Sequence, residues 1–185
     1  MKPIVLASAS PRRQEICTLL GLTFTVRPAV SEASVDLALG VDEAVIKVAR
    51  GKAEEIAAAH PDTPVLGADT AVVIDGEILG KPHDAEHAKA MLRRLSGRTH
   101  RVITGVWLCN NEKSGGFADS AEVVFAPMTE DEIEAYVSSG EPMDKAGAYG
   151  IQGYGMRFIT GIHGDFYTVM GLPSGRLYAF LKENL

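Results

Sequence analysis

The sequence predicts an α/β fold in which helices flank a mixed central sheet. Two observations carry this prediction: short apolar runs alternate with segments of helical periodicity, and two long stretches alternate apolar and polar residues as antiparallel strands do. With 185 residues, 46% of them hydrophobic, the chain is long enough to bury one substantial core. We therefore expect a single domain over residues 1–185, with two lobes around a cleft that holds the functional site.

The first predicted strand, residues 4–6, leads into a serine-rich turn and a helix. Ser10 is a suitable N-cap and Pro11 fits the first helical position. Arg12 and Arg13 follow in the first turn, where free backbone N–H groups and the helix dipole attract anions. These residues predict either a phosphate site or a capped helix that carries two solvated arginines.

A second strand is expected over residues 23–27, followed by a polar loop that contains Glu32. Apolar residues at helical spacing then predict a helix from Asp42 to about Ala59. Lys52 lies on the apolar face of this helix. A charge there is costly unless its ammonium group reaches an open cleft or an anionic partner, or its stem snorkels to the surface. Both explanations of Lys52 stay open at this point.

The central stretch, residues 65–84, contains three short apolar runs. The small residues 67–68 are expected to form a corner after the first run, which would place the Asp69 carboxylate at a strand end. The Asp-Gly pair at 75–76 favours a tight two-residue hairpin, and the chain then returns to Lys81. A carboxylate and an ammonium presented in this way suit an anion with its metal ion, although a solvated surface hairpin explains the same residues.

Asp84 is expected to cap the next helix, which ends before Gly97. The segment HDAEH at 83–87 matches the zinc-binding pattern of one metallopeptidase class. That class needs both histidines on one helix, whereas a helix capped by Asp84 leaves His83 outside it. We therefore interpret the match as a coincidence.

The second half of the chain begins with two long antiparallel strands, expected over residues 101–109 and 117–126. A helix with a complete capping box opens at Thr129. The apolar residues between 159 and 169 are expected on one or two further strands, and a helix over residues 177–185 closes the chain.

The segment at 144–155 is rich in glycine, which lets a backbone approach a ligand closely or adopt unusual φ angles. It is not a dinucleotide fingerprint, because no predicted strand precedes it and no helix follows. Gln152 at its centre carries both a donor and an acceptor, as reading the edge of a nucleotide base requires.

Composition and charge narrow the functional classes. A formal net charge of −6 argues against general nucleic-acid binding, although a local group of cations could still bind a small phosphorylated ligand. No stretch approaches the roughly 20 apolar residues of a membrane helix, so we expect no membrane association and a cytoplasmic location. Cys17 and Cys109 are far apart and lack CxxC spacing, which predicts reduced, buried thiols.

Four blocks of the chain, taken in order, resemble the Maf family of nucleoside triphosphate pyrophosphatases. They are LASASPRR, LGADTAVVIDGEILGKPHD, LSGRTHRVITG, and DKAGAYGIQGYG with the later GLP. The SPRR and GAYGIQG blocks resemble the branch that acts on dTTP and UTP. The resemblance implies a fold related to inosine triphosphate pyrophosphatases, a divalent cation (Mg²⁺ or Mn²⁺), a cytoplasmic location and often a homodimer.

The resemblance also implies roles for individual residues. Asp69 matches the family's catalytic carboxylate, as a general base or as a metal ligand. Glu32 falls in an acidic loop that could hold the metal, although Ala33 stands where a second acid is common. The residues that match substrate-binding positions are Ser8, Arg12, Arg13, Lys52, Thr70, Lys81 and Gln152.

The expected activity is metal-dependent hydrolysis of dTTP and UTP to a nucleoside monophosphate and pyrophosphate, in a nucleotide house-cleaning role. One alternative is a pyrophosphatase for 7-methyl-GTP or another modified nucleotide. A second alternative is a nucleotide-binding regulator of septum formation, whose output is a partner interaction rather than turnover.

Overall fold

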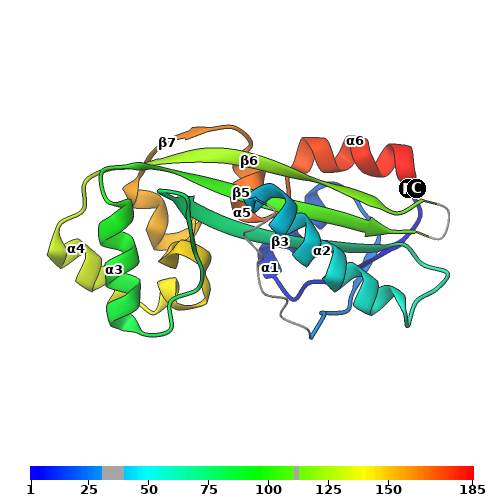
Figure 1. Ribbon diagram of the computed structural model, residues 1–185, viewed down its shortest axis with the longest axis horizontal. Coiled ribbons are helices and arrows are strands. Elements are labelled where there is room, and N and C mark those ends of the chain that lie inside the picture. Colours follow the sequence, from blue (N-terminus) through cyan, green and yellow to red (C-terminus); the bar gives the residue numbers. More distant parts are fainter. Residues whose placement is uncertain (31–39, 111–112) are drawn as a thin grey trace. The chain divides into compact units, whose positions relative to one another are not determined.

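The computed structural model describes residues 1–30, 40–110 and 113–185 (Figure 1). Its strands are β1 (Ile4–Leu6), β2 (Phe24–Val26), β3 (Val65–Ile74), β4 (Glu77–Leu79), β5 (Thr99–Cys109), β6 (Gly115–Phe125) and β7 (Ile159–His163). Its α-helices are α1 (Pro11–Leu19), α2 (Val41–Ala57), α3 (Ala85–Leu95), α4 (Glu130–Ser138), α5 (Phe166–Met170) and α6 (Ser174–Asn184). Three short 3₁₀ helices lie between α4 and β7: η2 (Glu141–Asp144), η3 (Ala146–Ala148) and η4 (Gly153–Phe158).

In the described part of the chain, seven strands form one sheet in the order β2-β1-β3-β5-β6-β7, with β4 paired to β3 off this path. Strand β1 runs parallel to both β2 and β3, whereas β4 is antiparallel to β3 and β7 is antiparallel to β6. The predicted mixed sheet with accompanying helices is therefore confirmed. No described helix combines the length and the apolar character needed to cross a membrane.

The chain divides into two compact units. Unit 1 comprises Met1–Thr70, Ile103–Asp119 and Gly171–Leu185, and unit 2 comprises Ala71–Val102 and Ser120–Met170. Strands β3, β5 and β6 each contribute residues to both units. Two units agree with the expectation of two lobes, and the cleft stays a prediction.

In unit 1, helix α2 lies directly on strands β3 and β5 because two glycines leave room for its backbone. A Cβ atom at Gly67 would lie 2.2 Å from the carbonyl oxygen of Ala49, and one at Gly105 would lie 2.5 Å from the carbonyl carbon of Val45. Both distances are far below normal van der Waals contact. The two contacts are one helical turn apart, so they determine both the height and the direction of α2 over the sheet.

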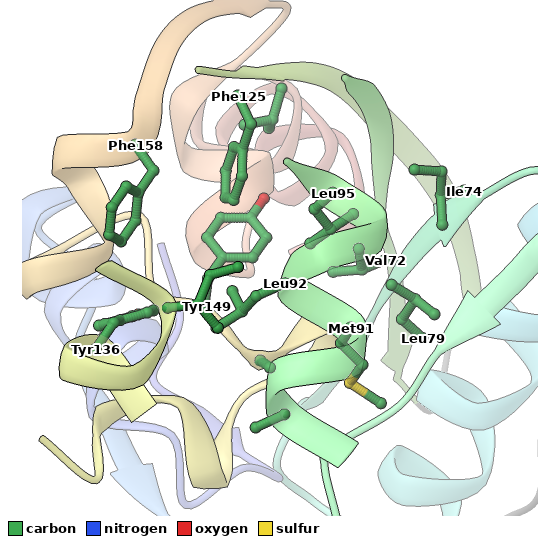
Figure 2. Close-up of a cluster of buried hydrophobic side chains, with 14 of the residues drawn as sticks. Val72, Ile74, Leu79, Met91, Leu92, Leu95, Phe125, Tyr136, Tyr149 and Phe158 are labelled. Carbon is green, nitrogen blue, oxygen red and sulfur yellow. The ribbon is translucent and has the colours of Figure 1, made fainter. Parts of the chain in front are cut away.

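Unit 2 has its own apolar core, in which side chains of α3 pack against aromatic rings from later segments (Figure 2). The rings of Phe125 and Tyr149 meet edge to face with their centroids 4.8 Å apart, and those of Tyr136 and Phe158 meet in the same way at 5.4 Å. Such edge-to-face pairs stabilise a core beyond the apolar area that they bury. The core therefore anchors the glycine-rich segment through Tyr149 at its middle and Phe158 just after it.

The structure differs from the expected elements in the central stretch. The predicted corner at residues 67–68 is wrong: β3 continues without a break from Val65 to Ile74, so Asp69 lies within a strand and not at its end. Gly67 serves the close approach of α2 and not a turn. The hairpin at 75–76 is confirmed, because Ile74 pairs with Glu77 and both turn residues have positive φ angles.

The end of the chain also differs. Residues Phe166–Met170 form the short helix α5, whereas strands were expected up to Val169. Asp165 starts this helix, because its carboxylate accepts the N–H of Tyr167 (2.9 Å) and its carbonyl accepts the N–H of Thr168 (3.1 Å). The closing helix, α6, begins at Ser174, three residues earlier than expected.

Candidate active site

Lys52 and Asp69 form an ion pair in unit 1. The Lys52 Nζ atom lies 2.6 Å from Asp69 Oδ1, and the two side chains are 21% and 20% exposed. The lysine belongs to α2 and the aspartate to β3. Gly67, two residues before Asp69, allows this helix and this strand to approach each other closely. The charge on the apolar face of α2 is thus explained by an anionic partner and not by snorkelling.

Arg13 joins three separate segments of unit 1. Its Nε donates to the carbonyl oxygen of Gly171, its Nη1 to the Ser8 hydroxyl and its Nη2 to the Thr70 hydroxyl, each at 3.0 Å. Burial lowers the pKa of Arg13, and the carboxylate of Asp69 opposes this shift. An arginine stays protonated despite such a shift, so a positive charge is held beside Thr70.

A second threonine extends this arrangement. The hydroxyls of Thr70 and Thr104 lie 2.9 Å apart and share a hydrogen bond, and Thr104 is fully buried on β5. Consecutive residues of a strand point to opposite sides, so Asp69 contacts Lys52 of α2 while Thr70 contacts Arg13 of α1. The Asp69–Lys52 ion pair and the hydrogen bonds of Thr70 are therefore joined by the peptide that links residues 69 and 70.

Gly171 is the partner of Arg13 in the last segment of unit 1. Its φ angle of +122° favours glycine, and a Cβ atom there would lie 3.2 Å from Arg13 Nε. Neither Gly171 nor Thr104 was among the site residues predicted from the sequence. Thr104 carries a signal that could have revealed it, namely a hydroxyl inside the otherwise apolar run 102–108.

The other predicted site residues stand as follows. Arg12 is half-buried in α1, and its charge further lowers the pKa of Arg13. Glu32 lies outside the described residues. Lys81 and Gln152 both belong to unit 2 and are not part of the contacts around Asp69 described above. Unit 1 thus brings together Asp69 and four of the predicted substrate-binding residues, which are Ser8, Arg13, Lys52 and Thr70.

Lys81 and Gln152 come from neighbouring segments of unit 2. The carbonyl of Gly80, next to Lys81, accepts the N–H of Gly147 at 3.0 Å. Lys81 is exposed and Gln152 is half-buried. The lysine and the glycine-rich segment are therefore held beside each other by a backbone hydrogen bond.

The described residues contain no group of three or more His, Cys, Asp or Glu side chains that could hold a metal ion. Asp69 alone still suits Mg²⁺ in one common arrangement, in which one or two carboxylates bind the ion and substrate phosphates supply further oxygen ligands. In the HDAEH segment, Asp84 caps α3 by accepting the N–H of His87 (2.7 Å), and His83 lies before the helix as expected.

Comparison with known proteins gives one consistent result. A family model described as "Maf-like protein" matches residues 3–184. A Bacillus velezensis protein is 48% identical over 182 residues, which cover 98% of this chain and 96% of the relative. Relatives from Bacillus cytotoxicus (46% identical, 99% of this chain, 96% of the relative) and Halalkalibacterium halodurans (44%, 98% and 96%) match equally broadly. Each of these three relatives is named dTTP/UTP pyrophosphatase.

Proposed function

This chain belongs to the Maf family, and from that premise we propose that it hydrolyses dTTP and UTP to the nucleoside monophosphate and pyrophosphate. The names of relatives that match nearly its whole length support this activity. The structural observation that carries the proposal is the ion pair of Lys52 and Asp69, whose carboxylate is close enough to Arg13 to oppose the lowering of the arginine's pKa. A carboxylate paired with one cation and interacting electrostatically with a second suits chemistry on a phosphate anion.

We propose the following chemistry at this site. A water molecule attacks the α-phosphorus, the bond from that phosphorus to the bridging oxygen breaks, and pyrophosphate leaves with the electron pair. Asp69 orients the water and accepts its proton. Lys52 holds the Asp69 carboxylate in one orientation through a charge-assisted hydrogen bond.

The cationic residues neutralise the triphosphate. Arg13 and Arg12 from α1 and Lys52 from α2 supply positive charge in unit 1, and Ser8 and Thr70 hold the Arg13 guanidinium in place. Repulsion between a polyanion and an incoming nucleophile falls when fixed positive groups are already oriented toward the charge. We assign Lys81 to the same task and Gln152 to the base, both on the family resemblance alone.

A divalent cation, Mg²⁺ or Mn²⁺, fits the carboxylate of Asp69 together with substrate phosphates, as described above. Bound there, it would supply further charge neutralisation of the phosphates. Asp69 as a metal ligand is thus the alternative to Asp69 as the base. Glu32 as a second ligand, the cytoplasmic location and the homodimer stay predictions from the resemblance.

A pyrophosphate-release assay over a panel of nucleoside triphosphates tests the proposal. We expect release from dTTP and UTP with added Mg²⁺ or Mn²⁺, and none after chelation with EDTA. Strongest release from 7-methyl-GTP would overturn the pyrimidine assignment. Nucleotide binding without release under every metal condition would instead favour a regulator of septum formation.

A further inference from the structure

In unit 2, the buried Tyr136 and the half-buried Glu141 form a hydrogen-bonded pair beside the glycine-rich segment. The Tyr136 hydroxyl, at the end of α4, donates to Glu141 Oε1 at 2.9 Å. The Tyr136 ring packs against Phe158 in the core (Figure 2). The Lys145 ammonium donates to the backbone carbonyl of Glu141 at 2.7 Å, which restrains the backbone of the acidic residue.

The same pair binds the backbone of the glycine-rich segment at three points. The Tyr136 oxygen accepts the N–H of Gly150 at 3.1 Å. The Glu141 carboxylate accepts the N–H of Tyr154 at 2.8 Å through Oε2 and that of Gly155 at 3.0 Å through Oε1. These bonds hold the chain on both sides of residues 151–153, with Gln152 between them.

Two glycines of the segment are required by this arrangement. At Gly153 the φ angle is +81°, and a Cβ atom would lie 2.6 Å from Glu141 Oε2. At Gly155 a Cβ atom would lie 2.3 Å from the carbonyl oxygen of Gly150 and 2.6 Å from the Tyr136 hydroxyl. Any side chain at either place would displace the pair or the loop. The glycines are therefore explained by the loop's own packing around the pair.

The charge state of the pair strengthens these bonds. Burial raises the pKa of Glu141, but the hydrogen bonds from Tyr154, Gly155 and Tyr136 outweigh it and bring the pKa below its ordinary value. Burial raises the pKa of the Tyr136 hydroxyl, which therefore stays protonated and donates. Each bond to Glu141 is thus charge-assisted and stronger than a bond between neutral groups.

We propose that Tyr136 and Glu141 are positioning residues for base recognition, because they hold the backbone around Gln152 in the conformation that accepts a pyrimidine. This inference rests on the proposed function, in which Gln152 contacts the base. Neither residue need touch the nucleotide. Their effect reaches substrate affinity and base selectivity through the loop and does not involve the proposed base, Asp69.

The test uses Tyr136→Phe and Glu141→Gln in the full chain. Tyr136→Phe keeps the ring in the core and removes one donor and one acceptor, and Glu141→Gln keeps the shape and removes the charge. Tyr178→Phe and Glu183→Gln, both at exposed positions of α6, are the matched controls. Melting temperatures identify any variant that fails to fold, and the second variant then carries the test.

Two measurements are made on each protein. The first is amide hydrogen exchange at Gly150, Tyr154 and Gly155 without nucleotide, which we expect to be faster by about 10-fold in both variants. The second is steady-state kinetics with dTTP and dGTP. We expect KM for dTTP to rise about 10-fold, kcat to stay within about 2-fold, and the preference for dTTP over dGTP to shrink.

Unchanged KM and unchanged base preference in both variants, with faster exchange, would overturn the inference. An equal loss of kcat for both nucleotides would also overturn it, because that result indicates only a structural role. If the wild-type protein released pyrophosphate from no triphosphate, the proposed function would fail and the inference with it. Wild-type turnover therefore distinguishes failure of the function from failure of the inference alone, and amide exchange, which needs no substrate, still shows in either case whether the pair restrains the loop.

Discussion

The ammonium of Lys52 lies 2.6 Å from the carboxylate of Asp69. The two residues come from a helix and a strand that Gly67 allows to approach each other, since Ala49 and Ala53 of the helix pack over that glycine. Because the pair is only partly exposed, its hydrogen bond is less screened by water than one at the surface. An acidic group in a defined orientation is what the proposed hydrolysis requires.

Replacement of Asp69 by Asn should leave the fold intact and lower kcat for dTTP by about 10²-fold to 10⁴-fold, because an amide neither accepts the proton nor binds a divalent cation well. Pyrophosphate release at saturating substrate measures this effect. Asp62→Asn, at an exposed loop position, is the control and should keep full activity. Near-normal turnover in the Asp69 variant would contradict the assignment.

Replacement of Lys52 by Met should lower kcat/KM for dTTP by about 10²-fold, since it removes both the orienting partner of Asp69 and one phosphate-neutralising charge. Stability should change by only about 1 kcal/mol because the pair is partly exposed. Lys47→Met, at an exposed position of the same helix, is the control, because it removes a lysine charge from α2 but leaves the ion pair intact. Equal effects of the two substitutions would show that the Asp69 contact is unimportant.

Arg13→Lys should destabilise the protein by about 1–3 kcal/mol, although the charge is retained. An ammonium lacks the planar group that reaches the Ser8 and Thr70 hydroxyls and the Gly171 carbonyl together. Urea unfolding, followed by circular dichroism, gives the difference. The matched substitution is Arg27→Lys, whose exposed guanidinium donates to the adjacent Val26 carbonyl. Indistinguishable midpoints for the two variants would refute the bridging role of Arg13.

Gly67→Ala should destabilise unit 1 by about 1–3 kcal/mol or more, because a Cβ atom there meets the helix backbone at 2.2 Å. Gly51→Ala is its control within α2, where the new methyl group finds open space and should instead stabilise the helix by about 0.5–1 kcal/mol. In urea unfolding, we expect the two substitutions to change the free energy of unfolding in opposite directions. A neutral Gly67→Ala variant would show that α2 need not lie so close to the sheet.

His100 should make stability fall in mild acid. It is 3% exposed, its Nε2 lies 2.7 Å from the Tyr149 hydroxyl, and burial lowers its pKa to about 4. In the unfolded chain a histidine titrates near 6.5, so between about pH 6.5 and 4 the unfolded state binds more protons and folding weakens as pH falls. The total loss should reach about 3 kcal/mol.

Urea unfolding at several pH values checks this dependence. In His100→Gln the free energy of unfolding should lose the part of its pH dependence that this residue causes. His60→Gln, at a partly exposed loop position, should leave the pH dependence unchanged. An unchanged pH dependence of the free energy of unfolding in His100→Gln would mean that the buried ring does not titrate in this range.

Local chemistry made most of the secondary structure predictable from the sequence. The capping box of Thr129 with Glu132, the cap of Asp84 on His87 and the hairpin at 75–76 all form between residues at most four positions apart. Such contacts need little more than short-range sterics and hydrogen bonding. Two predictions were wrong. At Gly67 a distant partner, helix α2, determined the backbone conformation, and at residues 166–170 the short apolar run was compatible with either a strand or a helix.

The candidate site divides in the same way. Chain order and residue chemistry, together with the family resemblance, were enough to single out Asp69, Lys52 and Arg13, because acid and cation types imply their chemistry. The partner of each came only from the fold: Arg13 bonds to Gly171, 158 residues away, and Thr70 to Thr104, 34 residues away. The sequence alone thus determined which functional groups the protein carries and where its local turns and caps lie. Only the tertiary structure decided which groups meet, since packing and not chain distance brings them within hydrogen-bond range.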